Sequence, residues 1–193
     1  MSETQRVIPN IEACIDCGAC EVACQRTWGL PAGSERIRVV RTNEAEDGPP
    51  RGGGEAHVPM SCFHCAEAPC ISACPTGAMT RSDNGQVRID KDQCIGCAYC
   101  VMSCPFGAPQ IADDDAQEET DDRFGSPEAG LADKCTLCEP RLENGDEPAC
   151  VSECPTDALL FGTPTELSSK LREDTVENAL SDDQLSIIFG GDQ

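Results

Sequence analysis

Four closely spaced cysteines constrain this chain more than any other part of its sequence. Residues 94–105 read C-I-G-C-A-Y-C-V-M-S-C-P, in which the cysteines are separated by two, two and three residues and a proline follows the last one. This spacing is that of the bacterial-type ligand run for cuboidal 4Fe–4S clusters, whose fourth cysteine ligates a second, neighbouring cluster. The run therefore predicts an iron–sulfur protein with a partner run elsewhere in the chain.

All 16 cysteines belong to four such groups. Group one contains Cys14, Cys17, Cys20 and Cys24; group two Cys62, Cys65, Cys70 and Cys74; group three Cys94, Cys97, Cys100 and Cys104; and group four Cys135, Cys138, Cys150 and Cys154. A proline follows the fourth cysteine of groups two, three and four, whereas Gln25 follows that of group one. With four thiolates for each cluster, these cysteines predict four 4Fe–4S clusters.

Disulfide bonds and structural zinc are the alternative uses of so many cysteines. Disulfide frameworks belong to short secreted chains, whose cysteines are scattered among loops rather than grouped two residues apart. Structural zinc sites use two well-separated C-x2-C pairs, but three of the four groups have a third or fourth cysteine close behind the pair. A structural zinc-binding module is kept as the alternative from another class of protein.

Acidic side chains far outnumber basic ones. The chain has 35 Asp and Glu against 14 Lys and Arg, a formal net charge of −21, and three of the cations are lysines: Lys91, Lys134 and Lys170. Because nucleic-acid binding needs clustered basic residues, this composition excludes nucleic acid as a partner. The acid is spread along the chain and is densest in residues 113–122. Such diffuse acidity favours the hypothesis of a halophilic protein, whose self-repulsion is screened by salt.

Large apolar side chains are scarce, with one Trp, one Tyr and five Phe. We therefore expect the clusters to act as the core, so that cluster binding and folding are coupled. No apolar run is long enough to span a membrane, and residues 1–9 contain no apolar signal core. We expect no direct membrane insertion and no signal peptide of the chain's own.

The segments between the cysteine groups predict an α+β fold with long loops. Residues 36–42 and 86–90 have the pattern of short strands, and a turn at residues 83–85 precedes the second. The Gly- and Pro-rich residues 44–55 predict a surface loop. The acidic residues 113–130 predict an exposed insertion.

An internal repeat indicates two ferredoxin-like units with two clusters each. Group one resembles group three, and C-P-T-G-A-M at the end of group two resembles C-P-T-D-A-L at the end of group four. Residues 62–104 have the layout of a complete two-cluster unit, which leaves groups one and four to join. We therefore expect an inner unit at 62–104 nested within an outer unit formed by 1–61 and 105–164. Residues 165–193 predict a helical tail that docks a partner.

No grouping of side chains indicates catalysis. The sequence has no nucleotide-binding loop and no hydrolase nucleophile motif, and His57 and His64 are its two histidines. His64 lies between two ligands and could donate a hydrogen bond to a cluster, but a partly exposed loop histidine is the favoured interpretation. Lys91 and Lys134 precede groups three and four and could offset cluster charge, although solvated surface lysines need no such role.

These motifs give the chain a clear family resemblance. It resembles the electron-transfer (β) subunits of molybdopterin oxidoreductases of the dimethyl sulfoxide reductase, polysulfide/thiosulfate reductase and formate dehydrogenase type. The resemblance covers about residues 8–165 and rests on C-I-D-C-G-A-C-E-V-A-C, S-C-F-H-C-A-E-A-P-C, C-P-T-G-A-M, C-I-G-C-A-Y-C-V-M-S-C-P-F-G-A-P-Q and D-K-C-T-L-C. Nitrate-reductase-like relatives have a tryptophan and a three-iron cluster at the position of Cys97, so the resemblance implies four-iron clusters here.

The resemblance also implies which cysteines share a cluster. The four implied ligand sets are Cys14, Cys17, Cys20 and Cys154; Cys24, Cys135, Cys138 and Cys150; Cys62, Cys65, Cys70 and Cys104; and Cys74, Cys94, Cys97 and Cys100.

The implied function is that of a non-catalytic subunit. It would relay single electrons between a membrane anchor subunit that exchanges electrons with quinol and a molybdopterin-containing catalytic subunit. The resemblance thus implies membrane association through these partners, on the cytoplasmic face or after export with a partner that carries a twin-arginine signal. A free-standing polyferredoxin is the alternative within the same class.

Overall fold

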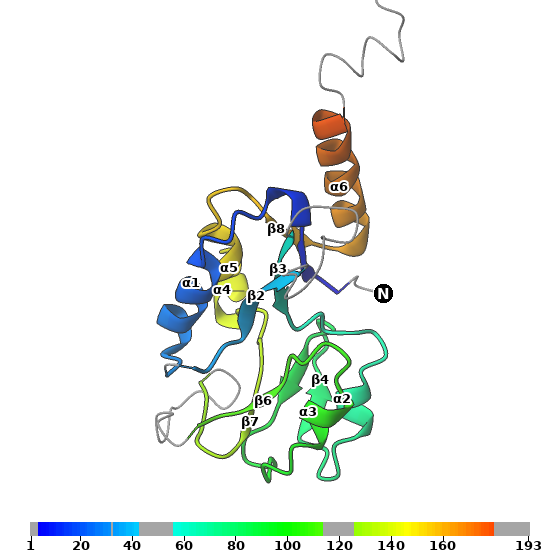
Figure 1. The fold of residues 1–193 in the computed structure, drawn as a ribbon. Coiled ribbons are helices and arrows are strands. Elements are labelled where there is room, and N and C mark those ends of the chain that lie inside the picture. Colours follow the sequence, from blue (N-terminus) through cyan, green and yellow to red (C-terminus); the bar gives the residue numbers. More distant parts are fainter. Residues whose placement is uncertain (1–3, 32, 43–55, 114–125, 180–193) are drawn as a thin grey trace, which may run out of the picture.

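The computed structural model describes residues 4–31, 33–42, 56–113 and 126–179. Short strands and helices alternate along these residues, so the predicted α+β character is confirmed. Figure 1 shows two halves, which we name after their helices, with helix α6 projecting from the half that contains β8. Segments from both ends of the chain form the α1/α5 half, and a central segment forms the α2/α3 half.

Two antiparallel strand pairs belong to the α1/α5 half. Strand β1 (Arg6–Pro9) pairs with β8 (Leu159–Gly162), so the beginning of the described chain lies beside a segment that follows group four. Strand β2 (Ile37–Thr42) pairs with β3 (Ala56–Ser61), and β2 lies within the strand predicted at 36–42.

The helices of this half are α1 (Ala19–Trp28), α4 (Glu139–Glu143) and α5 (Ala149–Ser152), with a 3-10 turn, η1, at Ile11–Ala13. Helix α1 follows Gly18 and ends at Gly29, and both glycines have left-handed φ angles, of 69° and 58°. Glycine adopts this conformation without a steric penalty. Helix α1 contacts α5, which brings cysteines of groups one and four to one place.

The α2/α3 half is built in a similar way. Its helices α2 (Pro69–Ser72) and α3 (Tyr99–Ser103) contact each other, and β4 (Met79–Arg81) pairs with β5 (Val87–Ile89). Gly85, with φ 80°, lies in the turn predicted between these two strands. Strands β6 (Gln110–Ile111) and β7 (Ala132–Asp133) form a further antiparallel pair.

Cysteines are central members of both hydrophobic cores. In the α1/α5 half, Cys20, Cys24 and Cys150 are buried together with Val7, Leu30, Ile37, Leu137 and Leu159. In the α2/α3 half, Cys70 and Cys100 are buried with Ala68, Met79, Val87, Ile89 and Ala132. The side chains that would bind iron are therefore the same ones that fill the interior.

Helix α6 (Pro164–Ala179) follows β8 and begins one residue before the tail, 165–193, that the sequence predicts as helical. Its Leu167 is buried, and the helix contacts β8. Within the described residues no helix is both long and apolar enough to cross a membrane. The predicted loop at 44–55, most of the insertion at 113–130 and residues 180–193 lie outside the described residues.

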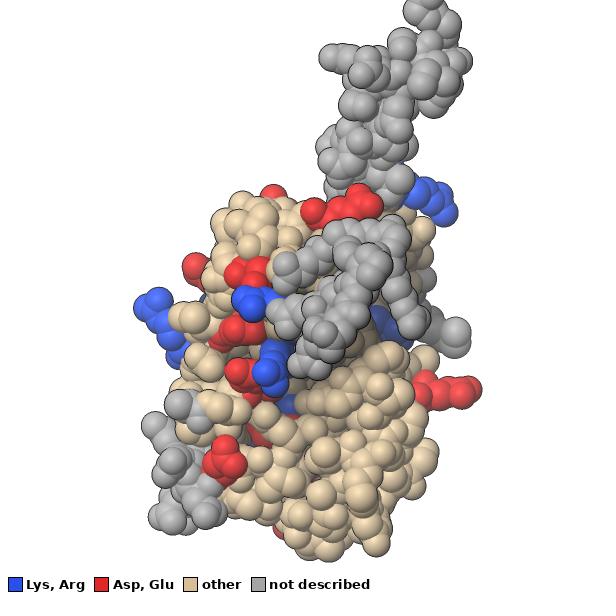
Figure 2. All heavy atoms as spheres, viewed as in Figure 1, with Lys and Arg blue, Asp and Glu red and all other residues tan. Residues whose placement is uncertain are grey.

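Charge is distributed unevenly between the two halves. On the face in Figure 2, acidic and basic side chains gather over the α1/α5 half, while the α2/α3 half is almost free of them. The sequence explains this contrast, because residues 93–112, which include α3, contain no charged residue.

Candidate iron–sulfur cluster sites

The backbone repeats the same turn at all four C-x2-C pairs. The residue before the second cysteine is left-handed each time: Asp16 (φ 56°), His64 (φ 46°), Gly96 (φ 67°) and Leu137 (φ 58°). For residues other than glycine this conformation costs about 1–2 kcal/mol. The turn occurs four times, three times at a non-glycine residue, which indicates a shared requirement, and in two of the four it directs an N–H group at the preceding sulfur. His64 N lies 3.5 Å from Cys62 Sγ, and Leu137 N lies 3.3 Å from Cys135 Sγ.

The C-P-T-G-A and C-P-T-D-A segments also fold alike. Met79 N donates to Cys74 Sγ at 3.5 Å, and Ala158 N donates to Cys154 Sγ at 3.2 Å. Burial of Cys74 opposes ionisation, but hydrogen bonds from Met79 N–H and from Thr76 outweigh it and lower the pKa of Cys74. N–H···S hydrogen bonds stabilise a thiolate, which is the form that binds iron.

Electrostatic contacts join cysteines of groups one and four. Burial, Glu21 and then the thiolates of Cys14 and Cys154 raise the pKa of Cys20 to about 11. Burial, followed by the thiolates of Cys135 and Cys138, raises the pKa of Cys24. Cys14 and Cys154, which are 140 positions apart in the sequence, therefore both influence Cys20. Cys135 likewise influences Cys24, although 111 positions separate them.

The same holds for groups two and three. Burial, then Cys62 and then Cys104 raise the pKa of Cys70, although the positive charge of Lys134 acts in the opposite direction. Burial raises the pKa of Cys100 to about 11, and Cys94 and Cys70 contribute to the rise.

Three further contacts connect one implied ligand set to the next. Cys20 contributes to the raised pKa of Cys150 after burial and nearer thiolates. Burial raises the pKa of Cys135 to about 11, and Cys62 is the largest charge that adds to it. The third contact is the one between Cys70 and Cys100. Cysteines of groups one and four share the core of one half, those of groups two and three share the core of the other, and Cys135 and Cys62 are near enough to influence each other across the halves.

The arrangement of the thiols differs from that of a single-zinc site. Four thiolates on one zinc ion would lie about 3.8 Å apart, because each Zn–S bond is about 2.3 Å long in a tetrahedral site. Within the described residues, no three Cys, His, Asp or Glu side chains converge as ligands of a single metal ion. In a cubane each thiolate binds a different iron, so the four sulfurs need not converge. The cysteines present therefore suit 4Fe–4S clusters.

Two cysteines reach the surface, and they occupy equivalent positions in the repeat. Cys17 and Cys97 are exposed, whereas the other 14 cysteines are buried or half-buried. The neighbouring Ile15 and Ile95 are 62% and 65% exposed. A cluster bound by Cys17 or Cys97 would lie close to the surface, where electrons can enter or leave.

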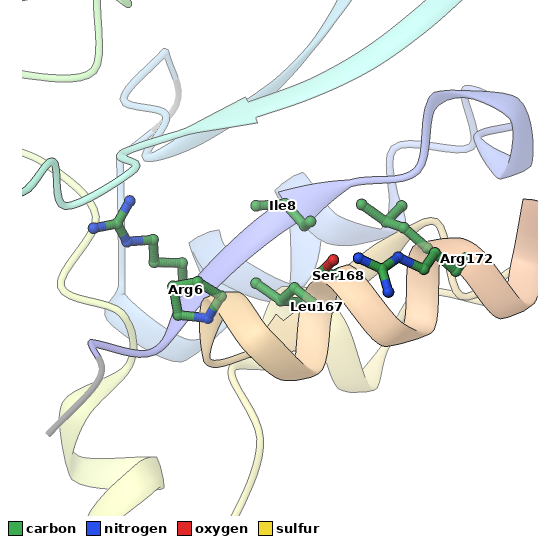
Figure 3. A pocket seen from close by; sticks show the side chains of 7 residues that line it. Arg6, Ile8, Leu167, Ser168 and Arg172 are labelled. Carbon is green, nitrogen blue, oxygen red and sulfur yellow. The ribbon is translucent and has the colours of Figure 1, made fainter.

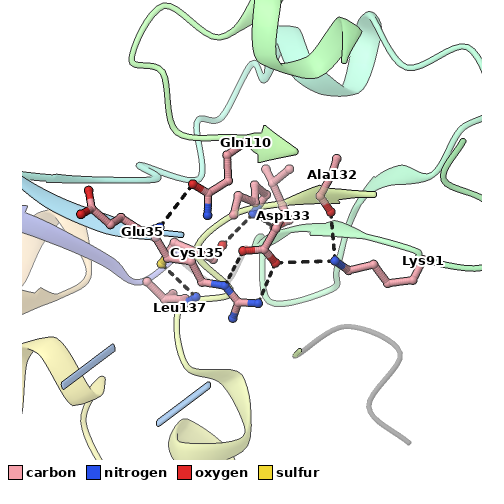
Figure 4. A network of polar contacts seen from close by, with 10 residues as sticks. Glu35, Lys91, Gln110, Ala132, Asp133, Cys135 and Leu137 are labelled. Carbon is pink, nitrogen blue, oxygen red and sulfur yellow. Dashed lines mark hydrogen bonds and ion pairs between the residues drawn. The ribbon is translucent and has the colours of Figure 1, made fainter. Parts of the chain in front are cut away.

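A network of buried charges lies between the two halves (Figure 4). Arg36 forms two hydrogen bonds with Asp133, of 2.8 Å and 2.7 Å, and Lys91 Nζ lies 3.5 Å from the same carboxylate. Lys134 Nζ donates to the carbonyl oxygens of Val87 and Cys135. Sequence reasoning missed Arg36 and Asp133, because neither is near its partner in the chain.

Three residues are far more buried than the sequence suggested. Lys91 and Lys134 are 4% and 2% exposed, so the interpretation of both as solvated surface lysines is wrong. Lys91 reaches Asp133 and the Ala132 carbonyl, and Lys134 reaches two carbonyls, which accounts for their inward direction. His64 is fully buried rather than partly exposed, because its Nδ1 accepts a hydrogen bond from Val87 N at 3.0 Å.

His64 is also held in its neutral form. Burial and then the charges of Lys134, Arg6 and Arg81 lower the pKa of His64 well below its usual value. Since Nδ1 is the acceptor, the proton of the neutral ring is on Nε2, and this buried atom has no hydrogen-bond partner in the described part of the chain. The sequence feature that pointed to His64 as a candidate functional residue was its position between Cys62 and Cys65.

Comparison with known protein families gives the same result as the geometry. Two family models match, both described as a 4Fe-4S dicluster domain, one over residues 55–164 and the other over residues 13–78. The chain belongs to the 4Fe–4S dicluster family. Two dicluster domains correspond to the four 4Fe–4S clusters predicted from the 16 cysteines of this dicluster protein.

Its relatives include subunits of several reductases. It is 45% identical over 154 residues to the thiosulfate reductase electron transfer subunit of Salmonella typhi, covering 77% of this chain and 70% of the relative. It is 37% identical over 177 residues to the formate dehydrogenase iron-sulfur subunit of Wolinella succinogenes, covering 83% and 82%. It is 36% identical over 165 residues to a putative dimethyl sulfoxide reductase iron-sulfur subunit of Halobacterium salinarum, covering 78% and 63%. The resemblance to oxidoreductase electron-transfer subunits is confirmed.

Proposed function

We propose that this chain is the non-catalytic electron-transfer subunit of a molybdopterin oxidoreductase. It relays single electrons through four 4Fe–4S clusters between a quinol-interacting membrane anchor and a molybdopterin catalytic subunit. The observation that carries the proposal is the gathering of the cysteines of all four groups in the two cores, with one exposed cysteine in each half: Cys17 in the α1/α5 half and Cys97 in the α2/α3 half. The relatives' function as iron–sulfur subunits supports it further.

We assign the ligands as the family resemblance implies. The clusters would form a row, in the order Cys14, Cys17, Cys20 and Cys154; then Cys24, Cys135, Cys138 and Cys150; then Cys62, Cys65, Cys70 and Cys104; then Cys74, Cys94, Cys97 and Cys100. Contacts within these sets (Cys20 with Cys154, Cys24 with Cys135, Cys70 with Cys104) support the assignment. Contacts between successive sets support the order.

The units follow from this assignment. An inner unit at residues 62–104 would hold the last two clusters, and residues 1–61 with 105–164 would form an outer unit around it. The antiparallel pairing of β1 with β8 supports this nested arrangement, because it joins the two ends of the outer unit. The contact between α1 and α5 supports it in the same way.

Each part of the protein has a physical task in this relay. The clusters supply reversible one-electron chemistry at potentials that local charge, hydrogen bonds to sulfur and exposure determine. The cysteines fix the positions of the clusters, and the N–H groups of His64, Met79, Leu137 and Ala158 donate to ligand sulfurs. Seven of the sixteen cysteines are buried and seven are half-buried, which limits the access of water to the clusters.

The two ends of the row differ in chemistry. Around Cys97, the side chains of Ile95, Tyr99 and Met102 are 65%, 51% and 71% exposed, in a segment without charge. Around Cys17, acidic residues are interspersed, among them Asp16 and Glu21. An apolar, uncharged surface suits a permanent subunit contact, so we assign the Cys97 end to a partner that stays bound.

The region of helix α6 is the second partner surface we propose. An apolar groove of about 690 Å³ lies between β1 and α6, where Ile8 and Leu167 lie side by side and Arg6 and Arg172 stand at opposite ends (Figure 3). Its apolar lining and flanking guanidinium groups suit an apolar segment of a partner that also carries acidic side chains. Residues 165–193 would dock this partner.

Iron and acid-labile sulfide counting on anaerobically purified protein tests the proposal, followed by EPR during a redox titration. Four cubanes require about sixteen irons and sixteen sulfides per chain. Zinc without sulfide would reject the relay altogether. Co-purification with a molybdenum-containing subunit and a membrane subunit supports a complex, whereas isolation as a single chain supports a polyferredoxin.

A further inference from the structure

Among the described residues, Lys134 is a buried cation without a carboxylate partner. It is 2% exposed, in a chain with three lysines and a net charge of −21. Within the part of the chain that the structure describes, its Nζ donates to two groups, the carbonyl oxygens of Val87 and Cys135. Carbonyl groups satisfy the hydrogen bonds of an ammonium group but do not cancel its charge, so burial remains costly unless an anion lies nearby.

The carboxylates in this region are engaged elsewhere. Asp133 is shared by Arg36 and Lys91. Asp90 is buried too, but its carboxylate accepts hydrogen bonds from Asp92 N and Gln93 Nε2, at 3.1 Å and 2.7 Å. The negative charge of half-buried Glu128 favours the charged form of Lys91, whose pKa is lowered chiefly by burial. Among the described residues, the buried charged side chains are therefore three cations and two carboxylates.

The ammonium group of Lys134 lies beside cysteine-bearing segments of both halves. Its Nζ is 2.8 Å from the carbonyl oxygen of Cys135, the next residue in the chain. It also reaches across to the carbonyl oxygen of Val87 in β5, which packs in the same core as Cys70. In agreement with this placement, the positive charge of Lys134 opposes the rise that burial causes in the pKa of Cys135 and Cys70. Lys134 thus lies where Cys135 and Cys62 come together, between the second and third ligand sets of the proposed row.

We propose that the Lys134 ammonium group is a fixed counter-charge shared by the two central clusters, and that it raises the potentials of both. The inference rests on the proposed ligand sets, with Cys135 in the second and Cys70 in the third. A cluster gains one negative charge when it accepts an electron, so a buried cation stabilises the reduced form. The two end clusters are bound by other groups and would feel this charge less.

The test is the Lys134→Met variant in the complete complex, with the four potentials measured by EPR during a redox titration. Methionine has a similar length and no charge. We expect two potentials to move to more negative values and two to keep their wild-type values. Because the charge is buried, the shift should persist at high salt, which screens exposed charges. Four unchanged potentials, or an equal shift of all four, would overturn the proposal.

Arg38→Met is the matched control. The Arg38 side chain is 73% exposed and lies 3.5 Å from Glu35, so this substitution takes away the same charge from the surface. We expect no selective shift in this variant. A shift of the same two potentials, equal to that in Lys134→Met, would show that net charge rather than the position of Lys134 is responsible.

A charge-preserving variant covers the case in which Lys134→Met does not assemble its clusters. Lys134→Arg should then keep the full iron content and potentials close to those of the wild type. If Lys134→Arg also loses its clusters, the proposal that Lys134 acts through its positive charge is contradicted. The wild-type iron count separates the two proposals: fewer than four cubanes contradicts the relay, whereas four cubanes with unshifted potentials contradicts the inference about Lys134 alone.

Discussion

Arg36 and Asp133 form a bidentate ion pair in the interior, although 97 positions separate them in the sequence. Their side chains are 1% and 2% exposed, and the Trp28 ring lies 5.1 Å from the Arg36 guanidinium carbon. Arg36 directly precedes β2 in the α1/α5 half, while Asp133 ends β7, whose Ala132 packs in the core of the α2/α3 half. The pair therefore ties the two halves of the protein together.

We expect Arg36→Met to destabilise the protein strongly. Among the described residues, Lys91 at 3.5 Å would then be the cation that remains beside the buried Asp133 carboxylate. Removing one partner of a buried ion pair costs about 3–5 kcal/mol. The guanidinium chloride midpoint for loss of the cluster absorbance, measured anaerobically, would report the effect.

Arg38→Met is the control for this prediction. The Arg38 side chain is 73% exposed and lies 3.5 Å from Glu35, as a surface ion pair. Such pairs contribute at most about 1 kcal/mol. Equal midpoints for the two variants would contradict a structural role for the buried pair.

Gly96 is the position where a single methyl group should do most damage. A Cβ atom there would lie 2.2 Å from the Gly130 carbonyl oxygen, and its φ of 67° is unfavourable for alanine. We expect Gly96→Ala to lose iron from the site of group three, since both the turn and the approach of residue 130 must shift. Iron content per chain is the measurement.

Gly107→Ala separates the two effects at Gly96. Gly107 has a similar φ of 63°, but a Cβ atom there would meet nothing within 4 Å. Both variants carry the left-handed penalty of about 1–2 kcal/mol, and Gly96→Ala carries the steric clash in addition. The prediction fails if Gly107→Ala loses as much iron as Gly96→Ala.

Sequence reasoning could predict the cysteine groups and the repeat because both are local. A C-x2-C pair fixes its own turn, and the structure repeats that turn at Asp16, His64, Gly96 and Leu137. The hairpin around Gly85 was predictable for the same reason. These features depend on neighbours in the chain, so their signals survive in a single sequence.

The contacts between distant segments could not be predicted in this way. Strand β1 is four residues long, and its pairing with β8 depends on the packing of both ends. Lys91, Lys134 and His64 were misjudged because charged and polar residues are usually exposed. Their burial follows from acceptors that come from other segments, such as Asp133 and Val87.

Removal of the clusters should abolish cooperative folding. Cys20, Cys24 and Cys150 belong to one hydrophobic core, and Cys70 and Cys100 to the other. We expect chelator-treated, reduced protein to show no cooperative thermal transition by circular dichroism. A sharp transition in the iron-free chain would show that the apolar residues suffice.

Stability should rise with salt if the acidity is a halophilic adaptation. At a net charge of −21 the acidic side chains repel one another. Salt screens this repulsion, because the Debye length falls from about 10 Å at 0.1 M salt to about 3 Å at 1 M salt. Thermal midpoints of the holo-protein, measured from low to multimolar KCl, test this hypothesis. A flat or falling midpoint would contradict it, and the acidic composition would then need another explanation.

The apolar surface around Cys97 gives a prediction about assembly. Tyr99 is 51% exposed beside Met102 and Ile95, in a segment of 20 residues without charge. A carboxylate placed there would be buried without a partner in a permanent subunit contact. We therefore expect Tyr99→Glu to weaken co-purification of one partner subunit by at least about tenfold, since 1.4 kcal/mol suffices for that change. Tyr99→Phe keeps the apolar ring and should assemble normally. Full assembly of Tyr99→Glu with all of its iron would show that this surface stays in contact with solvent. The permanent subunit contact would then have to lie elsewhere, and the groove beside α6 is the next candidate.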